Sequence, residues 1–464
     1  MFRIHTAPGA SVLFDKTFWT NHVVSAAQTY PALWHAALAL AAVQQWKSEK
    51  DAARKGVQQY NELSSENYVF ALKHYNHAIR HILPVASRQT HTYQDKEMIL
   101  ASEIMFFGIN SMLDYLVEAA EHAKNAIRLY DLWEFGRADD ENASTGFKGT
   151  AYSTPRGAVL RKRSLVSLIA DLRLQFLNRL DHQFMILRKE ARESYQPSAP
   201  AGKPLRSTDE AYDEMVLLLT EFLLATKMNA PVQVGILPSQ PLSFICHRRF
   251  STWIYKFEQF SQAFACSPPQ EGADKYRWRM LTIYVLVMRA RLLYGDVEDV
   301  HSLDRCAATF YQALEQLERF ADDWHGEPPA GTDSSQPAGF SFSMSMAEIC
   351  YCIATGCREH DLRCRAVALL RRWGVCDGMW DSNLMAALIE VTMQVEDEAG
   401  IANESLGAGV EPPCPCAYRK FVCGQHRIWA KQVRVGNGRE ALFSYSLVED
   451  VTSRLPMRTR KIMY

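Results

Sequence analysis

The sequence predicts an all-α fold, in which many helices are followed by a short β-hairpin at the C-terminus. Two observations lead to this class. Apolar residues recur three or four positions apart through most of the 464 residues, which is the spacing of one face of a helix. Alternation of apolar and polar residues, which is typical of a half-buried strand, is concentrated near the C-terminal end.

The clearest predicted helix covers residues 30–47 (YPALWHAALALAAVQQWK). Pro31 suits its first turn, because an N–H in that turn has no partner within the helix. Small and medium apolar residues form one narrow stripe that permits close packing: Leu33, Ala37, Leu40 and Ala41. Leu33, Leu40 and Val43 would suit a partner helix as readily as the core. Apolar stripes usually face their own domain, so we expect them to be buried.

The same spacing predicts the remaining helices. Residues 68–82 form a helix that Pro84 is expected to end. Residues 98–107 are almost continuously apolar, which predicts a buried helix. Further helices are expected around residues 122–133, 163–188, 213–227, 276–294, 301–324, 346–355, 361–373 and 382–398. The segments between them are rich in Gly, Ser, Pro, Asn or acidic residues, as surface connections are.

The C-terminal region changes character. Residues 427–435 (RIWAKQVRV) predict a strand with three apolar side chains on one face: Trp429, Val433 and Val435. Lys431 lies on the same face and interrupts the apolar pattern. A Gly-Asn-Gly turn follows, and residues 439–447 form the second strand. We therefore divide the chain into an N-terminal tail (1–17), a helical domain (18–400), a linker (401–426), a β-hairpin (427–450) and a basic tail (451–464).

Composition limits the classes of function. Lys and Arg number 51 against 52 Asp and Glu, which gives a formal net charge of −1. A domain that grips DNA unaided usually carries a clear basic excess, so we expect any contact with DNA to be indirect. The longest apolar stretch, residues 36–43, is too short to span a bilayer. Residues 1–16 lack the apolar core of a targeting signal, and we expect no membrane association.

The cysteines offer one candidate zinc site. All 11 lie between Cys246 and Cys423, and the odd number favours reduced thiols over a disulfide scaffold. Four possible ligands have the spacing C-x-C-x6-C-x2-H: Cys414, Cys416, Cys423 and His426. The one-residue spacer is shorter than usual, and prolines flank it. A loop with incidental cysteines is therefore the preferred interpretation.

A second cysteine group lies upstream: Cys350, Cys352, Cys357 and Cys364. Cys350 and Cys352 are two positions apart on a predicted helix, so their side chains point in different directions. We expect these residues to be buried thiols that act as small hydrophobic side chains. Neither group has the paired C-x2-C-x6-C pattern of a binuclear zinc cluster.

A helical, magnesium-dependent enzyme of terpene-synthase type is the alternative class. Residues 322–327 (DDWHGE) offer carboxylates for magnesium. The sequence has no second metal motif downstream, and the glycine and prolines there predict a solvated acidic helix end. P-loop, nucleophile-elbow, H-E-x-x-H and dinucleotide motifs are also missing from the sequence. We therefore assign no catalytic, cofactor-binding or metal-binding residue, and expect no enzyme and no cofactor.

Isolated histidines and basic runs have structural explanations. His35, His122 and His182 lie within helical patterns, where a hydrogen-bonded structural histidine is more common than a general base. Residues 161–163 and 458–461 are basic runs that would suit nuclear import. Solvated charges on a helix or a tail explain both runs equally well.

Several segments, taken together, resemble the regulatory (middle homology) domain of fungal zinc-cluster transcription factors. Phe18-Trp19 followed by residues 31–45 resembles the opening helix of that domain, and residues 70–82 (FALKHYNHAIRHI) resemble the next one. Residues 99–107 with 119–122 resemble its buried helix and the histidine segment that follows. Residues 179–183 (RLDHQ) match its Arg-Leu-Asp-x-Gln.

The most specific resemblance lies near the end of the helical region. Residues 357–370 (CREHDLRCRAVALL) resemble the family's Cys-Arg-x-x-x-x-Arg-Arg-x-Ala-Ile-x-Leu-Leu, and residues 377–382 (DGMWDS) resemble its Glu-Gly-x-Trp-Asp-Ser. Cys364 stands where the family usually has Arg, and Asp377 where it has Glu. The order and spacing of the motifs cover residues 18–398. We expect Arg363 and Arg365 to pair with Asp381, and Trp373 and Trp380 to be core aromatics.

The resemblance implies a helical domain that senses signals or partners, while an N-terminal zinc cluster reads the DNA. Residues 1–16 contain no cysteine, so we expect this chain to lack that cluster. Three explanations for the missing cluster remain open. The gene model is incomplete, the chain is a regulator that works through a DNA-bound partner, or it is a decoy that titrates such a partner. We expect the chain to be a nuclear regulator of a specialised-metabolite gene cluster. Its expected partner is a zinc-cluster paralogue or a dimer partner, and the sequence does not specify a small-molecule effector.

Overall fold

The structure is a computed structural model. It describes residues 18–54, 65–135, 158–178, 204–226, 240–266, 273–294, 302–326, 340–343, 346–378, 380–404, 426–436, 439–453 and 455–464, with Phe2, Thr6, Ala7, Phe14 and Gly424. The chain divides into two compact units. The first contains residues 1–176, 328–343 and 375–379, and the second contains residues 177–327, 344–374 and 380–464. Residues 382–398 and the C-terminal strands belong to the second unit.

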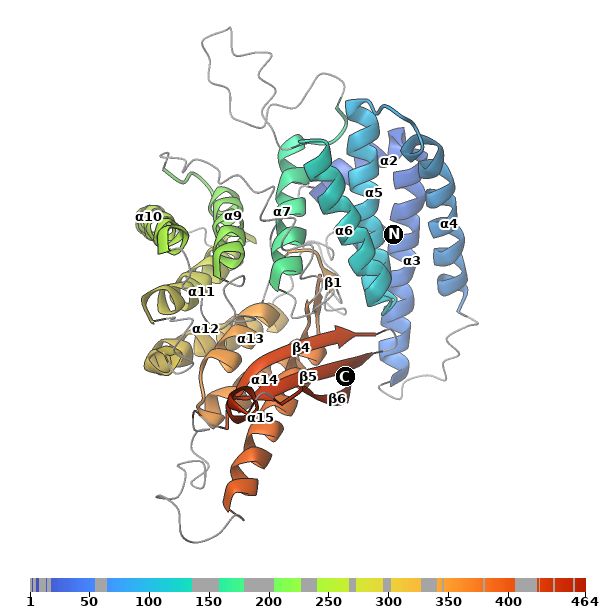
Figure 1. Cartoon of the computed structure of the whole chain (residues 1–464). Coiled ribbons are helices and arrows are strands. Elements are labelled where there is room, and N and C mark those ends of the chain that lie inside the picture. Colours follow the sequence, from blue (N-terminus) through green and yellow to red (C-terminus); the bar gives the residue numbers. More distant parts are fainter. Residues whose placement is uncertain are drawn as a thin grey trace. The chain divides into compact units, whose positions relative to one another are not determined.

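Helices form the first unit (Figure 1). Its elements are η2 (Phe18–His22), α2 (Val23–Thr29), α3 (Pro31–Arg54), α4 (Glu66–Ala86), α5 (Tyr93–Met112), α6 (Leu116–Leu132), α7 (Lys162–Asn178), and the short strands β1 (Phe340–Ser341) and β2 (Cys376–Asp377). Helix α3 packs against α2, α4 and α5, and α5 packs against α6. The two strands pair in parallel, Phe340 with Cys376 and Ser341 with Asp377.

Helix α5 is the centre of this unit. A capping box at Thr92 and Asp95 begins it, and Leu100, Ile104 and Phe107 are buried in its interior. The buried helix predicted over residues 98–107 is therefore confirmed, although it extends further at both ends. The ring of Phe342 stacks on Trp19 at 4.1 Å and meets Phe107 edge-on at 5.8 Å between ring centroids.

Of the neighbouring helices α3 and α4, α3 agrees with the sequence-based prediction in its buried face, and α4 differs in where it ends. Leu33, Leu40 and Val43 of α3 are buried, as expected. Pro84 does not end α4, because it lies in the last turn and the helix continues to Ala86. A proline there removes one backbone hydrogen bond, and the backbone N–H of Ser87 still reaches the Leu83 carbonyl at 3.0 Å.

The second unit combines helices with an antiparallel sheet (Figure 1). Its elements are α9 (Thr208–Thr226), α10 (Gln240–Cys266), α11 (Ala273–Tyr294), η7 (Ser302–Cys306), α12 (Ala307–Gly326), α13 (Met346–Gly356), α14 (His360–Trp373), β3 (Trp380–Asp381), α15 (Ser382–Glu404), β4 (Ile428–Val435), β5 (Glu440–Leu447), α16 (Val448–Thr452) and β6 (Arg458–Met463). Helix α14 packs against α12, α13 and α15. Trp373 and Trp380 are buried, as expected. In the described residues, no helix is long and apolar enough to cross a membrane.

The predicted hairpin is present and is part of a larger sheet. Strand β4 pairs with β5, and β5 pairs with β6, all antiparallel. A register shift between Ile428 and Ala430 turns Ile428 inward and leaves Trp429 36% exposed, so the expectation that Trp429 shares a face with Val433 is wrong. Residues 458–463, expected within a basic tail, form β6, in which Ile462 is buried.

Candidate functional site

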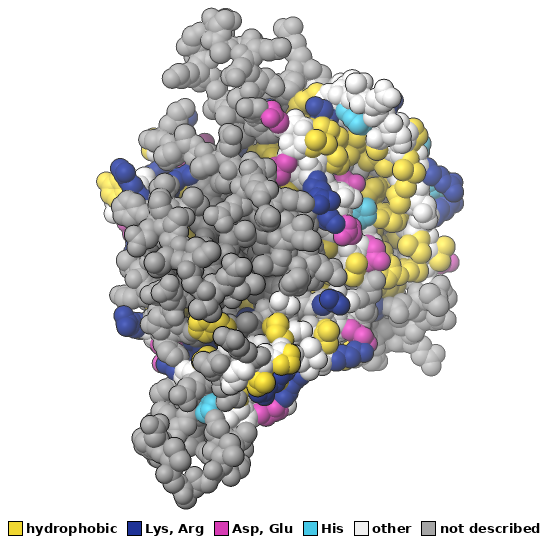
Figure 2. Space-filling view, in the orientation of Figure 1, with side chains coloured by type: hydrophobic (Ala, Val, Ile, Leu, Met, Phe, Trp, Pro, Cys, Tyr) yellow, Lys and Arg dark blue, Asp and Glu magenta, His cyan; other side chains and the backbone are white. Residues whose placement is uncertain are grey.

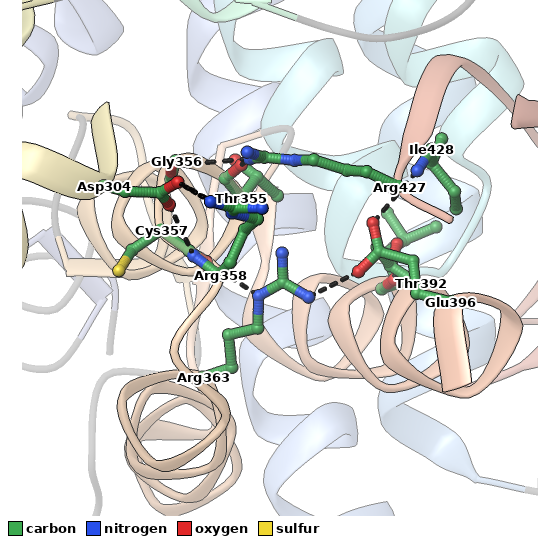
Figure 3. A network of polar contacts seen from close by, with 11 residues as sticks. Asp304, Thr355, Gly356, Cys357, Arg358, Arg363, Thr392, Glu396, Arg427 and Ile428 are labelled. Atoms are coloured by element: carbon green, nitrogen blue, oxygen red, sulfur yellow. Dashed lines mark hydrogen bonds and ion pairs between the residues drawn. The ribbon is translucent and has the colours of Figure 1, made fainter. Parts of the chain in front are cut away.

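A network of charged side chains lies inside the second unit, where α13, α14, α15 and the start of β4 meet (Figure 3). Three elements supply its central residues. Arg363 lies in the first turns of α14, Glu396 on α15, and Arg427 just before β4. Charged groups are rarely buried unless they are paired, so this is the position in the unit where polar chemistry is concentrated.

Arg363 and Glu396 form the central ion pair. Their side chains are 2% and 1% exposed, and Nη1 of Arg363 lies 2.5 Å from Oε2 of Glu396. Nε of Arg363 donates to the Cys357 carbonyl at 2.8 Å. The other oxygen of Glu396 accepts the backbone N–H of Ile428 at 3.0 Å. Glu396 therefore connects α14 to the first residue of β4.

Arg427 and Arg358 extend the network to the end of α13. Arg427 donates to the Thr355 carbonyl at 2.8 Å, at the last turn of α13, where helix carbonyls lack partners. Arg358 donates through Nε to Asp304 at 2.7 Å. Burial, together with the nearby Arg363 guanidinium, lowers the pKa of Arg427. The arrangement thus brings several cations close together and balances them with two carboxylates and a helix end.

Lys431 is a titratable group whose pKa this environment changes. It lies on β4, and its ammonium nitrogen is 4.9 Å from the centre of the Tyr351 ring. Burial, with a contribution from the Arg363 and Arg427 charges, lowers the pKa of Lys431 to about 7, while Glu396 opposes the shift. A lysine amine that is partly neutral near pH 7 is a nucleophile. Its ionisation also changes the net charge of the network.

The partners expected for the Arg-rich segment are wrong. Arg363 pairs with Glu396 instead of Asp381, and Arg365 pairs with Glu318 on α12, with 2.7 Å from Nη2 to Oε2. Asp381 accepts the backbone N–H groups of Asn383 and Leu384, at 2.8 and 3.1 Å. It therefore caps the N-terminus of α15, where a carboxylate is favoured by unpaired N–H groups and the helix dipole.

The carboxylates of the enzyme alternative are held in ion pairs. Asp322 lies 2.8 Å from Nη1 of Arg372, and Asp323 pairs with Arg279. Both carboxylates are more than half exposed, as expected for a solvated acidic helix end. One oxygen of each carboxylate thus has a guanidinium group as its partner, and Glu327 lies outside the described residues.

The structure describes one of the two cysteine groups and leaves most of the other outside the described residues. Cys414, Cys416 and Cys423 lie outside the described residues, while His426 is buried. Cys350 and Cys357 are buried, as expected. Cys352 is only half-buried, and it accepts a hydrogen bond from Arg291 at 3.4 Å. Cys364 is exposed on the outer side of α14, so its expected burial is wrong.

The predicted structural histidine on α6 is confirmed. His122 bonds through Nδ1 to Glu103 at 2.7 Å and through Nε2 to the Tyr75 hydroxyl at 3.0 Å. Asn110 donates to the same hydroxyl at 3.0 Å, which joins α4, α5 and α6. His35 lies in a histidine cluster, and His182 lies outside the described residues, as does the RLDHQ segment.

Sequence reasoning missed the residues that complete the network: Glu396, Arg427 and Asp304. Glu396 lies in the acidic end of a predicted helix, and charged residues in such a position are usually exposed, so the sequence pattern did not single it out. The available signal was its position on α15, seven and eight residues after the buried Ile389 and Leu388, on the same helix face. For Arg427, the sequence indicated only the start of the predicted hairpin.

No family model matches this chain, and the searches of curated proteins and of solved structures found no match either. The resemblance to the fungal regulatory domain therefore stays a prediction from its motifs.

Proposed function

We propose that this chain is a fungal-type transcriptional regulator that acts in the nucleus through a DNA-bound partner, such as a zinc-cluster paralogue. The observation that carries the proposal is the role of the resembling segment 357–370. Its Arg363 and the carbonyl of Cys357 take part in a buried network that fixes α13, α14, α15 and β4. A segment used in this way builds a rigid helical body, which suits a regulatory domain.

Ion pairing of the basic side chains favours an indirect contact with DNA. Arg371 pairs with Glu390, and Arg372 pairs with Asp322, both at 2.8 Å. In the C-terminal basic run, Lys461 pairs with Glu440 at 2.8 Å. Phosphate groups would have to compete with these carboxylates, which weakens the electrostatic term that dominates DNA affinity. A regulator with this surface needs a partner that reads the DNA.

Exposed apolar side chains favour a protein partner. Figure 2 shows apolar side chains gathered over the first unit, and those of α4 and α6 include Phe70, Leu83 and Leu132, which are 44%, 55% and 74% exposed. Helices α4 and α6 are joined by the hydrogen bond between Tyr75 and His122. Exposed apolar surface of this kind is more common at sites of protein contact than elsewhere.

Regulation through a partner requires contacts that differ between two states, with either a protein or a small ligand. By analogy with the family, the controlled genes belong to a specialised-metabolite gene cluster. Deletion of the gene is expected to lower the transcripts of one co-regulated set. The same transcript measurement distinguishes activation from repression at other target genes, because deletion lowers the transcripts of activated genes and raises those of repressed genes.

Chromatin immunoprecipitation of the tagged chain tests the proposal. Occupancy at the promoters of the co-regulated genes is expected in wild-type cells and should disappear when the DNA-bound partner is deleted. Occupancy that persists without any such partner would contradict it. Incubation of the purified chain with magnesium and prenyl diphosphates tests the alternative. Turnover that Asp323→Ala abolishes would establish an enzyme in place of a regulator.

A further inference from the structure

Four histidines form a cluster between α3 and α4 in the first unit. His74, His77 and His81 are three and four positions apart along α4, so they share one face of that helix. His35 on α3 lies against this face. Its ring centroid is 5.0, 5.1 and 5.4 Å from those of His74, His77 and His81, with interplanar angles of 28°, 27° and 13°. Helices α3 and α4 run side by side (Figure 1).

Two of the ring nitrogens have the separation of ligands on one metal ion. Nδ1 of His35 lies 2.8 Å from Nδ1 of His74. Imidazole nitrogens bind zinc at about 2.0–2.1 Å, which places two such ligands about 2.9 Å apart at a right angle and about 3.4 Å apart in a tetrahedron. A metal ion that replaces the shared proton would therefore need only a small separation of the two rings.

Among the described residues, the rings of the cluster are not held by carboxylate partners. No ion pair links any of the four rings to a carboxylate in the described part of the chain, in contrast to His122, which pairs with Glu103. The neighbouring Phe70 ring lies 4.3 Å from His74, and Lys73 is the adjacent cation. Neutral imidazole is the form that binds zinc, nickel or copper.

The other two histidines would supply the remaining ligands after rotation of their side chains. Among the described residues, no three His, Cys, Asp or Glu side chains already converge on one point. His77 is half-buried and His81 is exposed, so rotation about their side-chain bonds is not blocked by core packing. Histidines four positions apart on a helix, as these two are, can bind one metal ion together.

We propose that His35, His74, His77 and His81 form a binding site for one divalent transition-metal ion that prefers imidazole ligands, with Zn²⁺ as the probe. The bound ion joins α3 to α4. This site goes beyond the proposed function and does not depend on it, because it is a property of these two helices alone.

Isothermal titration of the metal-free, full-length chain with Zn²⁺ tests the site. His74→Gln removes a preformed ligand and is expected to abolish one equivalent of binding. His81→Gln changes an exposed side chain, leaves the fold intact, and is expected to weaken binding by about tenfold or more. Thermal unfolding gives a second readout, because an ion that binds only the folded state raises the melting temperature of the wild-type chain. That rise is expected to be absent in His74→Gln.

Two control variants separate this site from other ligands. Cys423→Ser removes a ligand of the candidate cysteine site, and His360→Gln removes an exposed histidine on α14. Both are expected to keep the equivalent of Zn²⁺ that His74→Gln loses. Far-UV circular dichroism checks that each variant is folded. Binding that is the same in His74→Gln as in the wild type, or that is lost only in Cys423→Ser, would overturn the proposal.

Discussion

The ring of Phe342 lies directly against the backbone of Gly108, and the contact leaves no space for a side chain. A Cβ atom at Gly108 would lie 2.3 Å from Cζ of that ring. Gly108 lies within α5, four residues before its last residue, and glycine inside a helix is otherwise unfavourable by roughly 0.5–1 kcal/mol relative to alanine. Close packing of the aromatic ring therefore outweighs helix propensity at this position.

Gly108→Ala is expected to destabilise the first unit by about 1–3 kcal/mol, because the ring of Phe342 must move out of a packed core. Guanidinium denaturation followed by circular dichroism measures the change. Phe342→Leu is expected to relieve part of the effect in the double variant. Gly436→Ala is a matched control, because its nearest neighbour, the Glu440 carbonyl oxygen, would lie at 3.6 Å. Equal stability of Gly108→Ala and the wild type would contradict the close contact.

Arg363→Met is expected to destabilise the second unit by about 3–5 kcal/mol, because it leaves Glu396 buried without its counter-charge. Adding Glu396→Gln is expected to recover part of this loss, since the amide oxygen still accepts the N–H of Ile428. Denaturation of the two single variants and the double variant gives the coupling energy. Strictly additive losses would mean that the two side chains do not interact.

Lys431 is expected to make stability depend on pH above neutrality. Its pKa is about 7 in the folded chain and 10.5 in the reference state. Between these values the unfolded chain binds a proton that the folded chain lacks, so stability rises with pH, by up to about 1.4 kcal/mol per pH unit. Below pH 7 the folded chain carries the full cost of a charged, partly buried lysine.

Lys431→Met is therefore expected to be more stable than the wild type at pH 6, with a difference that shrinks towards pH 10. Denaturation at several pH values measures it. Lys461→Met is the control, because Lys461 is 63% exposed on β6 and pairs with Glu440. Parallel pH profiles for Lys431→Met and the wild type would show that the lysine titrates normally.

Purified protein is expected to bind duplex DNA only as a non-specific binder, with a Kd of about 10⁻⁴–10⁻⁶ M at physiological salt. The formal net charge of −1 and the ion pairs of the basic side chains are the reasons. Fluorescence anisotropy with labelled promoter fragments and with scrambled fragments is the measurement. Nanomolar binding that distinguishes the two fragments would require this chain to read DNA itself.

Regular apolar spacing made most of the fold predictable. The stripe of Leu33 and Leu40 is buried, and residues 98–107 lie within a buried helix, because helical periodicity is a local property of the sequence. Helix α10 was missed. Its core residues Phe250, Trp253 and Phe257 have the right spacing, but further aromatic residues on its other faces, such as the exposed Tyr255, obscure the pattern.

The sequence by itself determined the helical class, the hairpin near the C-terminus, and the burial of Trp373 and Trp380. Only the tertiary structure decided which charges meet. Asp381 precedes a helix and is used to cap it, so Arg363 pairs with Glu396, 33 residues away. Residues 458–463 became a strand because β5 offered a free edge, with Phe443 opposite Arg460. Periodicity is encoded along the chain, whereas a charge or a strand edge acquires its partner only when distant segments pack together.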